Sequence, residues 1–228
     1  MAAFAFPRLA VFDCDGTLVD SQYSIIAAMA EAFEAHDCPP PKAEAVRRII
    51  GLPLGDAIGK LIPEAGPDVH ARLETGYIDA FRALRQEGAV ADPLYPGAPE
   101  ALDALRAAGW LLGVATGKSS RGLTATLETH GLTGHFQTLQ TADGGPGKPN
   151  PDMLLKAMDE TGAAPDGTVM IGDTTFDMEM ARHAGVMALG VSWGYHPQEH
   201  LRSAGAEAVV DDFPELLENL ETLEEGPK

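Results

Sequence analysis

The stretch RLAVFDCDGTLVD, residues 8–20, decides the fold of this 228-residue chain. A short apolar run ends at Asp13, and Asp15, Gly16 and Thr17 follow closely. Asp13 and Asp15 are separated by one residue, so in an extended chain both carboxylates project to the same side. Gly16 permits a tight turn that brings backbone N–H groups toward a ligand, and Thr17 adds a hydroxyl. The stretch predicts a buried strand that ends either in a binding site or in a simple turn with capping acids.

Further short apolar runs follow from Trp110 onward, and amphipathic segments separate them. They are WLLGVAT (110–116), HFQTLQT (135–141), TVMIG (168–172), GVMALGVS (185–192) and AEAVVD (206–211). Alternation of strands and helices is typical of a parallel sheet, and continuous apolar runs indicate strands buried on both faces. We therefore expect an α/β fold, a doubly wound parallel sheet, with a last helix after Asp211 whose acidic face is solvated.

The segment between the first strand and the later runs contains no comparable strand. Residues 21–37 and 67–88 instead carry apolar residues at helical spacing, which predicts amphipathic helices. The residues that show it are Ile25, Met29 and Phe33 in the first segment and Val69, Leu73, Tyr77 and Phe81 in the second. We expect an α/β core from residues 1–20 and 96–228, with an all-helical insertion over residues 21–95.

The overall charge limits the partners of the chain. Its 34 acidic and 16 basic residues give a formal net charge of -18, which would repel nucleic acid and anionic lipid. We expect a small-molecule partner, no nucleic acid and no membrane. An anionic substrate would need a metal or a few well-placed cations to reverse this field locally.

The cysteines and the N-terminus indicate a reduced, cytoplasmic setting. Cys14 and Cys38 are too few for a disulfide framework, so both are expected as free thiols. The initial MAAFAF run has no preceding basic region, and Pro7 and Arg8 interrupt it, so neither a signal peptide nor a membrane span is expected.

The run that ends at Thr116 and Gly117 is followed by Ser119 and Ser120, which are suited to cap a helix. A hydroxyl and free N–H groups would then lie at the edge of the sheet where the acids lie, as in an anion site. An ordinary strand-to-helix turn would have the same sequence.

Lys148 stands in the run GKPNPD, residues 147–152. We expect Pro149 to hold the lysine extended, and Asn150 as N-cap with Pro151 as first residue to begin a helix directly after it. This framing favours a functional lysine, although a free surface lysine is the alternative.

Asp173 and Asp177 follow the run TVMIG and lie four residues apart where a helix begins. They would therefore lie one turn apart on one face. A helix cap needs only one acid, and a second carboxylate facing inward would repel the first unless a cation lies between them. The pair predicts a cap or a metal site.

Together these residues lie at or just beyond strand ends, where open α/β sheets build their sites. Clustered carboxylates without histidine or cysteine ligands suit a hard cation such as Mg²⁺. The cation and Lys148 would cancel charge where an anionic substrate binds, so that Asp13 could attack phosphorus. Asp15 could give a proton to the leaving oxygen and later take one from water.

The four motifs DCDGT, VATG, GKPNPD and GDTTFD resemble those of the haloacid dehalogenase superfamily, phosphatase branch, over nearly the whole chain. The resemblance implies that Asp13 forms an aspartyl-phosphate and that Asp15 is the general acid/base. It also implies that Thr116 and Lys148 hold phosphate, and that the insertion is a mobile helical cap. The implied Mg²⁺ ligands are Asp13, the Asp15 carbonyl and Asp173, with Asp177 ordering the metal site.

Within the superfamily, DCDGTLVDS and LYPGAPEALDALRAAG look closest to phosphoglycolate phosphatase and its pyrophosphatase-like relatives. The acid at position 15 argues against the dehalogenase branch, and Thr17 against a mutase. Gly16, Gly117, Arg47 and Gly51 are expected to contact a small phosphorylated metabolite, and a sugar phosphate is an alternative to phosphoglycolate. The protein could be a monomer or a dimer.

Three other motifs offer different functions. Residues 190–194 satisfy G-x-S-x-G around Ser192, but no histidine follows the acids at 211 and 212, as a serine hydrolase would require. Residues 196–200 fit H-x-x-E-H, a zinc-peptidase signature, although Pro197 would leave His196 outside the helix that carries His200. Residues 113–119 are one residue short of a nucleotide-binding loop. We expect these segments to form the rim of the same pocket; a zinc peptidase or a non-catalytic phosphate-binding module remain alternatives.

Overall fold

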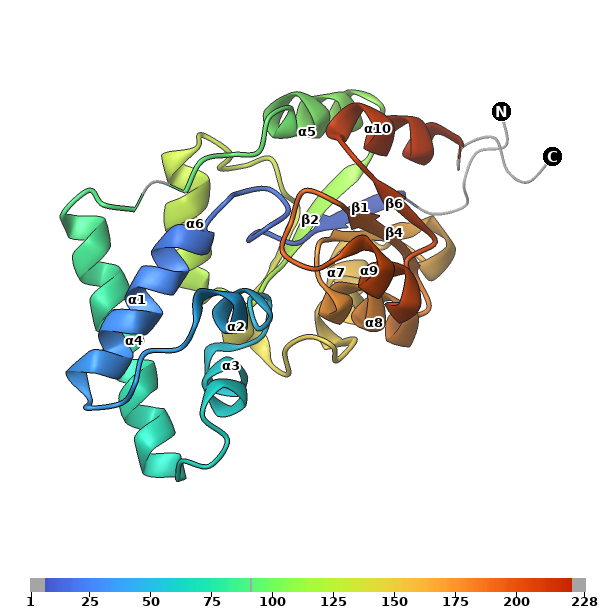
Figure 1. The fold of residues 1–228 in the computed structure, drawn as a ribbon. Coiled ribbons are helices and arrows are strands. Elements are labelled where there is room, and N and C mark those ends of the chain that lie inside the picture. The colour runs from blue at the N-terminus through green and yellow to red at the C-terminus, as the bar shows by residue number, and fades with distance from the viewer. Residues whose placement is uncertain (1–6, 91, 223–228) are drawn as a thin grey trace.

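The computed structural model describes residues 7–90 and 92–222, which form a parallel sheet covered by helices and joined to a separate group of helices (Figure 1). The strands are β1 Leu9–Phe12, β2 Leu111–Ala115, β3 Thr138–Gln140, β4 Thr168–Gly172, β5 Met187–Val191 and β6 Ala208–Val210. The helices that follow the first strand are α1 Gln22–Ala35, α2 Ala43–Arg47, α3 Leu54–Leu61, α4 Pro67–Gln86 and α5 Ala98–Ala107. The remaining helices are α6 Ser120–Thr129, α7 Asp152–Thr161, α8 Thr175–Ala184, α9 Gln198–Ala204 and α10 Phe213–Thr222, with short 3₁₀ turns at Ala142–Gly144 and Pro165–Gly167.

All strand pairs are parallel, in the order β3-β2-β1-β4-β5-β6. The chain winds from β1 outward through β2 and β3, then returns to β4 on the other side of β1. In such sheets ligands bind beyond the carboxyl ends of the strands, at the point where the order reverses. Phe12 pairs with Val114 on one side and Ile171 on the other, so the residues after β1, β2 and β4 meet at that point.

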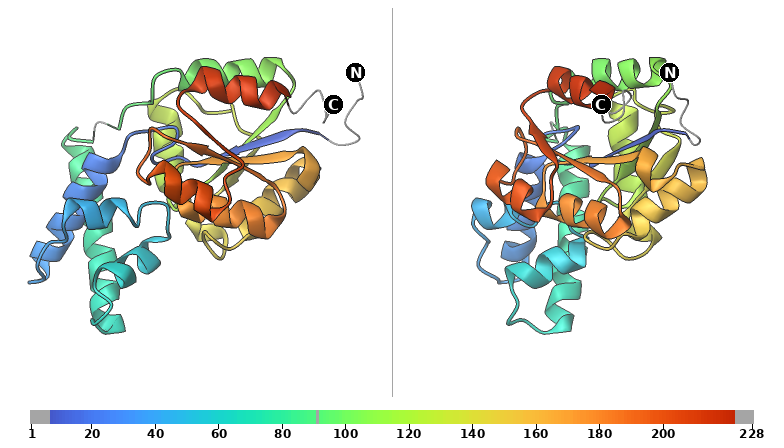
Figure 2. Two further views of the ribbon diagram at one scale, coloured as in Figure 1. Left: turned by 45° about the vertical axis from the view of Figure 1, so that its right-hand side comes forward. Right: turned by 90° about the vertical axis from the view of Figure 1, so that its right-hand side faces the viewer.

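Helices cover both faces of the sheet, α5 and α10 on one side and α7, α8 and α9 on the other (Figures 1 and 2). Alternate residues of β1 supply the two cores: Ala10 and Phe12 join the cluster with α5, α6 and α10, and Leu9 and Val11 join the cluster with α7, α8 and α9. Strands buried on both faces need apolar residues throughout, which explains their continuous apolar runs.

Helices α1–α4, called the helical insertion below, lie between β1 and α5 and pack around a hydrophobic cluster of their own. Ile25, Met29 and Phe33 of α1 and Leu73 of α4 belong to this cluster. Figure 1 shows the insertion beside the edge of the sheet where the strands end. In the described part of the chain, no helix combines the length and apolar character needed to cross a membrane.

The predicted doubly wound parallel α/β sheet is confirmed, and each predicted apolar run contains a strand. Two local predictions differ from the structure. Only residues 138–140 of the run 135–141 form a strand. Helix α7 begins at Asp152, one residue later than predicted, although Asn150 Oδ1 does accept a hydrogen bond from Asp152 N at 3.0 Å as a cap would. Pro151 is therefore the residue before the helix, and the peptide bond between Lys148 and Pro149 is cis.

Candidate active site

Asp13 lies at the carboxyl end of β1 with its side chain fully buried. Its backbone N–H donates to Ile171 O at 2.8 Å, which continues the pairing with β4. Its Oδ1 accepts a hydrogen bond from Cys14 N at 2.6 Å and lies 2.8 Å from Lys148 Nζ. Within the described residues, Oδ2 is buried and has no hydrogen-bond partner. One oxygen of Asp13 is thus anchored, and the other is free for a ligand.

Lys148 is also fully buried, and its Nζ lies 2.6 Å from Asp177 Oδ1. Burial alone would lower the pKa of Lys148, but Asp13 and Asp177 raise it above its usual value, so the ammonium is charged. Asp177 also belongs to a capping box, because its Oδ2 accepts from Thr174 N at 3.0 Å and its own N–H donates to Thr174 Oγ1 at 3.4 Å. The alternatives of cap and site residue are therefore not exclusive: one oxygen caps α8, and the other faces Lys148.

Asp173 follows β4 and is held from two directions. Thr17 Oγ1 donates to its Oδ1 at 3.0 Å, and Tyr195 N donates to its Oδ2 at 2.8 Å. Gly16 has φ of 84°, and a Cβ there would lie 2.2 Å from Asp173 Oδ2. Gly16 is thus required both by its left-handed backbone conformation and by the close approach of this carboxylate.

Three carboxylates meet at the switch point of the sheet. Asp13, Asp173 and Asp177 each offer an oxygen within 4.8 Å of the others, and all three are fully buried. Burial, and then repulsion from Asp177, raises the pKa of Asp173 to about 7. Burial also raises the pKa of Asp13 well above its usual value, which the opposing effect of Lys148 does not offset. One lysine does not balance three carboxylates, and with the free Oδ2 of Asp13 this arrangement fits a bound cation.

Asp15 is not part of this triad, and its carboxylate is paired with other residues. Lys118 Nζ lies 2.6 Å from Asp15 Oδ1, and the Ser21 hydroxyl donates to the same oxygen. The sequence reasoning missed Lys118, Ser21 and Tyr195. One feature of the sequence could have indicated Lys118: it stands two residues after Thr116, at the end of a predicted strand. Nothing in the sequence indicated Ser21 and Tyr195 except that they lie near predicted site segments.

Thr116 is fully buried at the end of β2, and its Oγ1 accepts from Lys118 N at 3.2 Å. Ser119 caps α6 as predicted, accepting from Gly122 N. A Cβ on Gly117 would lie 2.6 Å from Leu52 O and 2.8 Å from Gly51 O. Backbone of the helical insertion therefore lies directly against the turn after β2, and the site is covered on that side.

The other two predicted substrate residues lie on the helical insertion. Gly51, with φ of 99°, lies beside Thr174 and Phe176 of the core, so it reaches the strand-end region. The half-buried Arg47 is joined to α1 instead: its Nε donates to Gln22 Oε1 at 2.7 Å. Gln22 follows Ser21 in sequence, which places Arg47 near the site segment without a described contact to any of the carboxylates.

The competing motifs do not assemble sites of their own among the described residues. Ser192 Oγ donates to Asp211 Oδ1 at 2.6 Å, with no histidine in this pair. Helix α9 begins after Pro197, and His196 Nδ1 accepts from Thr175 N at 3.1 Å while its Nε2 faces Arg48 O at 3.3 Å. In the described part of the chain, the group of side chains placed to hold a metal ion is the triad of Asp13, Asp173 and Asp177, which includes no histidine.

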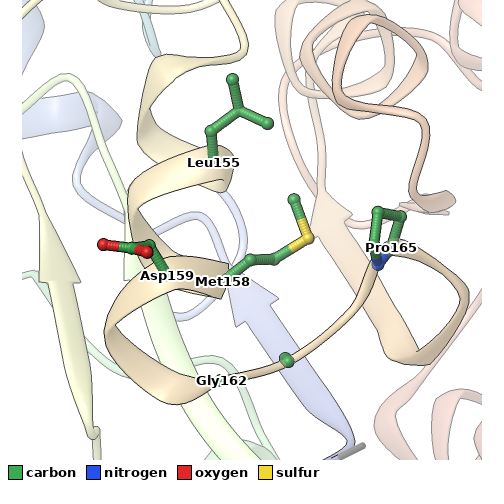
Figure 3. Close-up of a pocket in the computed structure, with 6 residues that line it drawn as sticks. Leu155, Met158, Asp159, Gly162 and Pro165 are labelled. Atoms are coloured by element: carbon green, nitrogen blue, oxygen red, sulfur yellow. The ribbon is translucent and has the colours of Figure 1, made fainter.

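A separate hollow of about 380 Å³ lies on α7 and the turn that follows it (Figure 3). It contains none of the strand-end residues described above. The residues that line it are Leu155, Met158, Asp159, Gly162, Ala163 and Pro165.

The fold and this site define a class, the phosphate-ester hydrolases that carry carboxylates at the strand ends of a doubly wound parallel sheet. More specifically, the chain belongs to the haloacid dehalogenase-like hydrolases, because the model of that family matches residues 10–191. The predicted resemblance and the predicted class of enzyme are thus confirmed.

Relatives along nearly the full length of the chain are phosphatases by name. "Probable phosphatase IndB" of Dickeya dadantii is 37% identical over 92% of this chain and 91% of its own. The phosphoglycolate phosphatase of Vibrio parahaemolyticus is 30% identical over 92% of this chain and 95% of its own. The N-acetylmuramic acid 6-phosphate phosphatase of Pseudomonas aeruginosa is 31% identical over 94% and 95%. Two different substrates thus appear in the names of relatives at nearly equal identity.

The fold has solved counterparts as well. The crystal structure of a hydrolase from Pseudomonas syringae covers 94% of this chain and 98% of its own, with a TM-score of 0.83 and 30% identity.

Proposed function

We infer that this protein is a Mg²⁺-dependent phosphatase that hydrolyses a small phosphomonoester through an aspartyl-phosphate on Asp13. The observation that carries the inference is the arrangement of Asp13 itself, a buried carboxylate with one oxygen anchored by Cys14 N and Lys148 and the other free. A carboxylate becomes a nucleophile toward phosphorus only where nearby cations reduce its repulsion from the phosphate oxygens.

The residues around Asp13 divide the remaining work. Lys148 and the N–H groups of the turns after β1 and β2 bind the phosphate oxygens, and the Thr116 hydroxyl adds a donor. In the first step an oxygen of Asp13 bonds to phosphorus while the bond to the leaving oxygen breaks. Asp15 gives that oxygen its proton. In the second step water bonds to phosphorus, the bond to Asp13 breaks, and Asp15 takes the proton from the water.

Mg²⁺ is the cation that the donor set favours, since it consists of carboxylate and carbonyl oxygens. Asp13, Asp173 and the Asp15 carbonyl would hold it, and Asp177 would order Lys148 and the turn after β4. When bound, the ion would neutralise negative charge on the phosphoryl group. Zinc bound by the segment 196–200 is disfavoured because His196 accepts a backbone hydrogen bond through Nδ1 and faces Arg48 O through Nε2.

We further propose that residues 21–95 act as a cap on a core of residues 1–20 and 96–228. Gly51 and Leu52 lie against Gly117, so a cap in this position would exclude water from the site. The cap would select the leaving group, with Gly51 at the site and Arg47 near its entrance. Phosphoglycolate is the best single substrate, on the motif resemblance and the named Vibrio relative. Pyrophosphate and sugar phosphates are the alternatives, the latter favoured by the Pseudomonas relative.

The test is a phosphatase assay of the metal-free protein with Mg²⁺ or Zn²⁺ added back. The substrates would be 2-phosphoglycolate, pyrophosphate, sugar phosphates and p-nitrophenyl phosphate. We expect turnover that needs Mg²⁺ and acid-stable, hydroxylamine-sensitive phosphate on the protein during turnover. Activity with Zn²⁺ alone, or a silent panel, would contradict the proposal, and a silent panel would favour a non-catalytic phosphate-binding module.

A further inference from the structure

Lys118 is a buried cation to which the reaction above gives no task. It follows Thr116 and Gly117 in the turn between β2 and α6. Its N–H donates to Thr116 Oγ1 at 3.2 Å, and its carbonyl accepts from Ala142 N at 3.0 Å. The backbone is therefore held on both sides, and the side chain starts from a fixed point.

The side chain of Lys118 ends at Asp15. Its Nζ lies 2.6 Å from Asp15 Oδ1, and the two side chains are only 11% and 8% exposed. The Ser21 hydroxyl donates to the same oxygen. Within residues 7–90 and 92–222, no donor contacts Asp15 Oδ2. Two donors from different segments thus hold one oxygen of this carboxylate and leave the other for proton transfer.

Helix α4 of the helical insertion covers this pair. The Phe81 ring centroid lies 6.0 Å from Lys118 Nζ, and the Phe81 ring packs on Tyr77 with centroids 5.9 Å apart. Removing water strengthens the attraction between the two charges. Burying such a pair nevertheless seldom stabilises a fold more than apolar side chains of the same size would. Stability alone therefore does not explain why a lysine is placed here.

We propose that Lys118 is a positioning residue for Asp15, which holds Oδ1 so that Oδ2 faces the reacting oxygens. This rests on the function proposed above. Oδ2 gives its proton to the leaving oxygen as the bond from phosphorus to that oxygen breaks. It takes a proton from water as the water oxygen bonds to phosphorus and the electron pair of the broken bond returns to Asp13. Lys118 acts through Asp15 and touches neither reacting oxygen.

The substitution Lys118→Met tests this with p-nitrophenyl phosphate, whose leaving group departs without a proton. Phosphorylation of Asp13 should then proceed within about threefold of the wild-type rate. Hydrolysis of the aspartyl-phosphate still needs a base and should slow by roughly 10²-fold. Stopped-flow release of p-nitrophenolate should show a burst approaching one equivalent per protein, followed by slow turnover. With an alkyl ester such as 2-phosphoglycolate both steps need Asp15, so the burst should be absent.

Three variants serve as controls. Lys118→Arg keeps the charge and should recover part of the hydrolysis rate, although its planar group fits the lysine position imperfectly. Ser21→Ala removes the second donor to Oδ1 and should give the same pattern more weakly. Lys156→Met breaks an ion pair on α7, in which Lys156 Nζ lies 2.9 Å from Asp152 Oδ2. This variant should leave both steps unchanged.

The outcomes separate this inference from the function on which it rests. A wild-type protein without Mg²⁺-dependent phosphatase activity contradicts the proposed function. An active wild type whose Lys118→Met variant raises KM alone, or slows the phosphorylation phase with p-nitrophenyl phosphate, assigns Lys118 to substrate binding and overturns the positioning role. If Lys118→Met does not fold, the Arg and Ser21→Ala variants carry the test, and wild-type hydrolysis rates in both overturn it.

Discussion

The sheet edge and the helical insertion bury different kinds of side chain. At the sheet edge, Asp13, Lys148, Asp173 and Asp177 lie within a few ångströms of one another, all fully or nearly fully buried. The insertion is built around aliphatic and aromatic side chains. Its contacts with the core include backbone at residues 48–52 and the apolar packing of Phe176 and Tyr195 against its cluster. Charge is thus concentrated where strands fix positions, and apolar packing dominates where a surface is covered.

This difference indicates separate roles for the two regions in the proposed enzyme: the sheet edge carries the chemistry, and the insertion covers the site. Strand register sets carboxylate positions to fractions of an ångström, which reaction chemistry requires. An apolar cover fixed by few polar contacts can move and can differ in shape without disturbing those positions. Substitutions at the sheet edge should therefore abolish turnover, whereas those between the regions should alter substrate binding.

The largest effect is expected from Asp13→Asn. The amide keeps the shape but is not a nucleophile, so kcat should fall by at least ~10⁴-fold with Mg²⁺ present. Steady-state assays and phosphate labelling of the protein would measure it. Asp159→Asn, on the exposed side of α7, is the matched control and should keep full activity. Wild-type turnover by Asp13→Asn would contradict the proposed nucleophile.

Lys148→Met should be the most destabilising change at the sheet edge. It leaves Asp13 and Asp177 buried without their cation, so the free energy of unfolding should fall by ~3–5 kcal/mol in metal-free protein. Urea denaturation would measure the loss, and Mg²⁺ should restore part of it. The partly exposed pair of Lys156 and Asp152 offers a control, since Lys156→Met should cost less than ~1 kcal/mol. Equal losses in the two variants would refute the distinction.

Gly117→Ala should separate the two regions functionally. The added Cβ would meet Leu52 O at 2.6 Å and displace residues 51–53, while the strand-end carboxylates keep their positions. We expect KM to rise by roughly tenfold with a smaller change in kcat. Gly122→Ala in α6 is the control, because its Cβ would meet Ser119 Oγ at an ordinary 3.4 Å. A loss confined to kcat would place the effect in the chemistry instead.

The smallest effect concerns His196, which joins the two regions. Its Nδ1 accepts from Thr175 N, so Nε2 carries the hydrogen and donates to Arg48 O. Burial lowers the pKa of His196. The hydrogen bond to Arg48 O and the charge of Asp177 oppose this effect, and the charges of His200 and Arg48 reinforce it. The unfolded chain then binds more protons, so this contribution to stability is present above pH 6.5 and is lost as the pH falls below it.

Urea midpoints measured between pH 5 and pH 7.5 would test this contribution. The wild type should lose more stability than His196→Gln over that range, because the glutamine cannot take up a proton. Parallel pH profiles for the two proteins would show that His196 does not link stability to pH.

Prediction from sequence is most successful where a single segment contains both a strand and the functional side chain that follows it. The runs ending at Asp13, Thr116 and Asp173 were identified as strands with chemistry at their ends, because an apolar run and the polar residue after it are adjacent in sequence. The sequence places the start of α7 one residue early, because Asn150 does supply the capping oxygen while Pro151 remains the residue before the helix. Lys118 was missed because nothing in its own segment shows which acid it meets.

The order of strands and helices, the family, and the residues expected to carry the chemistry followed from the sequence alone, because apolar periodicity and strand-end motifs are local properties of the chain. Tertiary structure decided which charged and polar side chains meet: Lys148 meets Asp13 and Asp177, and Lys118 and Ser21 meet the same oxygen of Asp15. It also decided that the insertion lies against Gly117. The contact between Lys148 and Asp13 joins residues that are 135 positions apart in sequence (148 minus 13). Such contacts depend on strand register and helix docking, which short-range patterns do not encode.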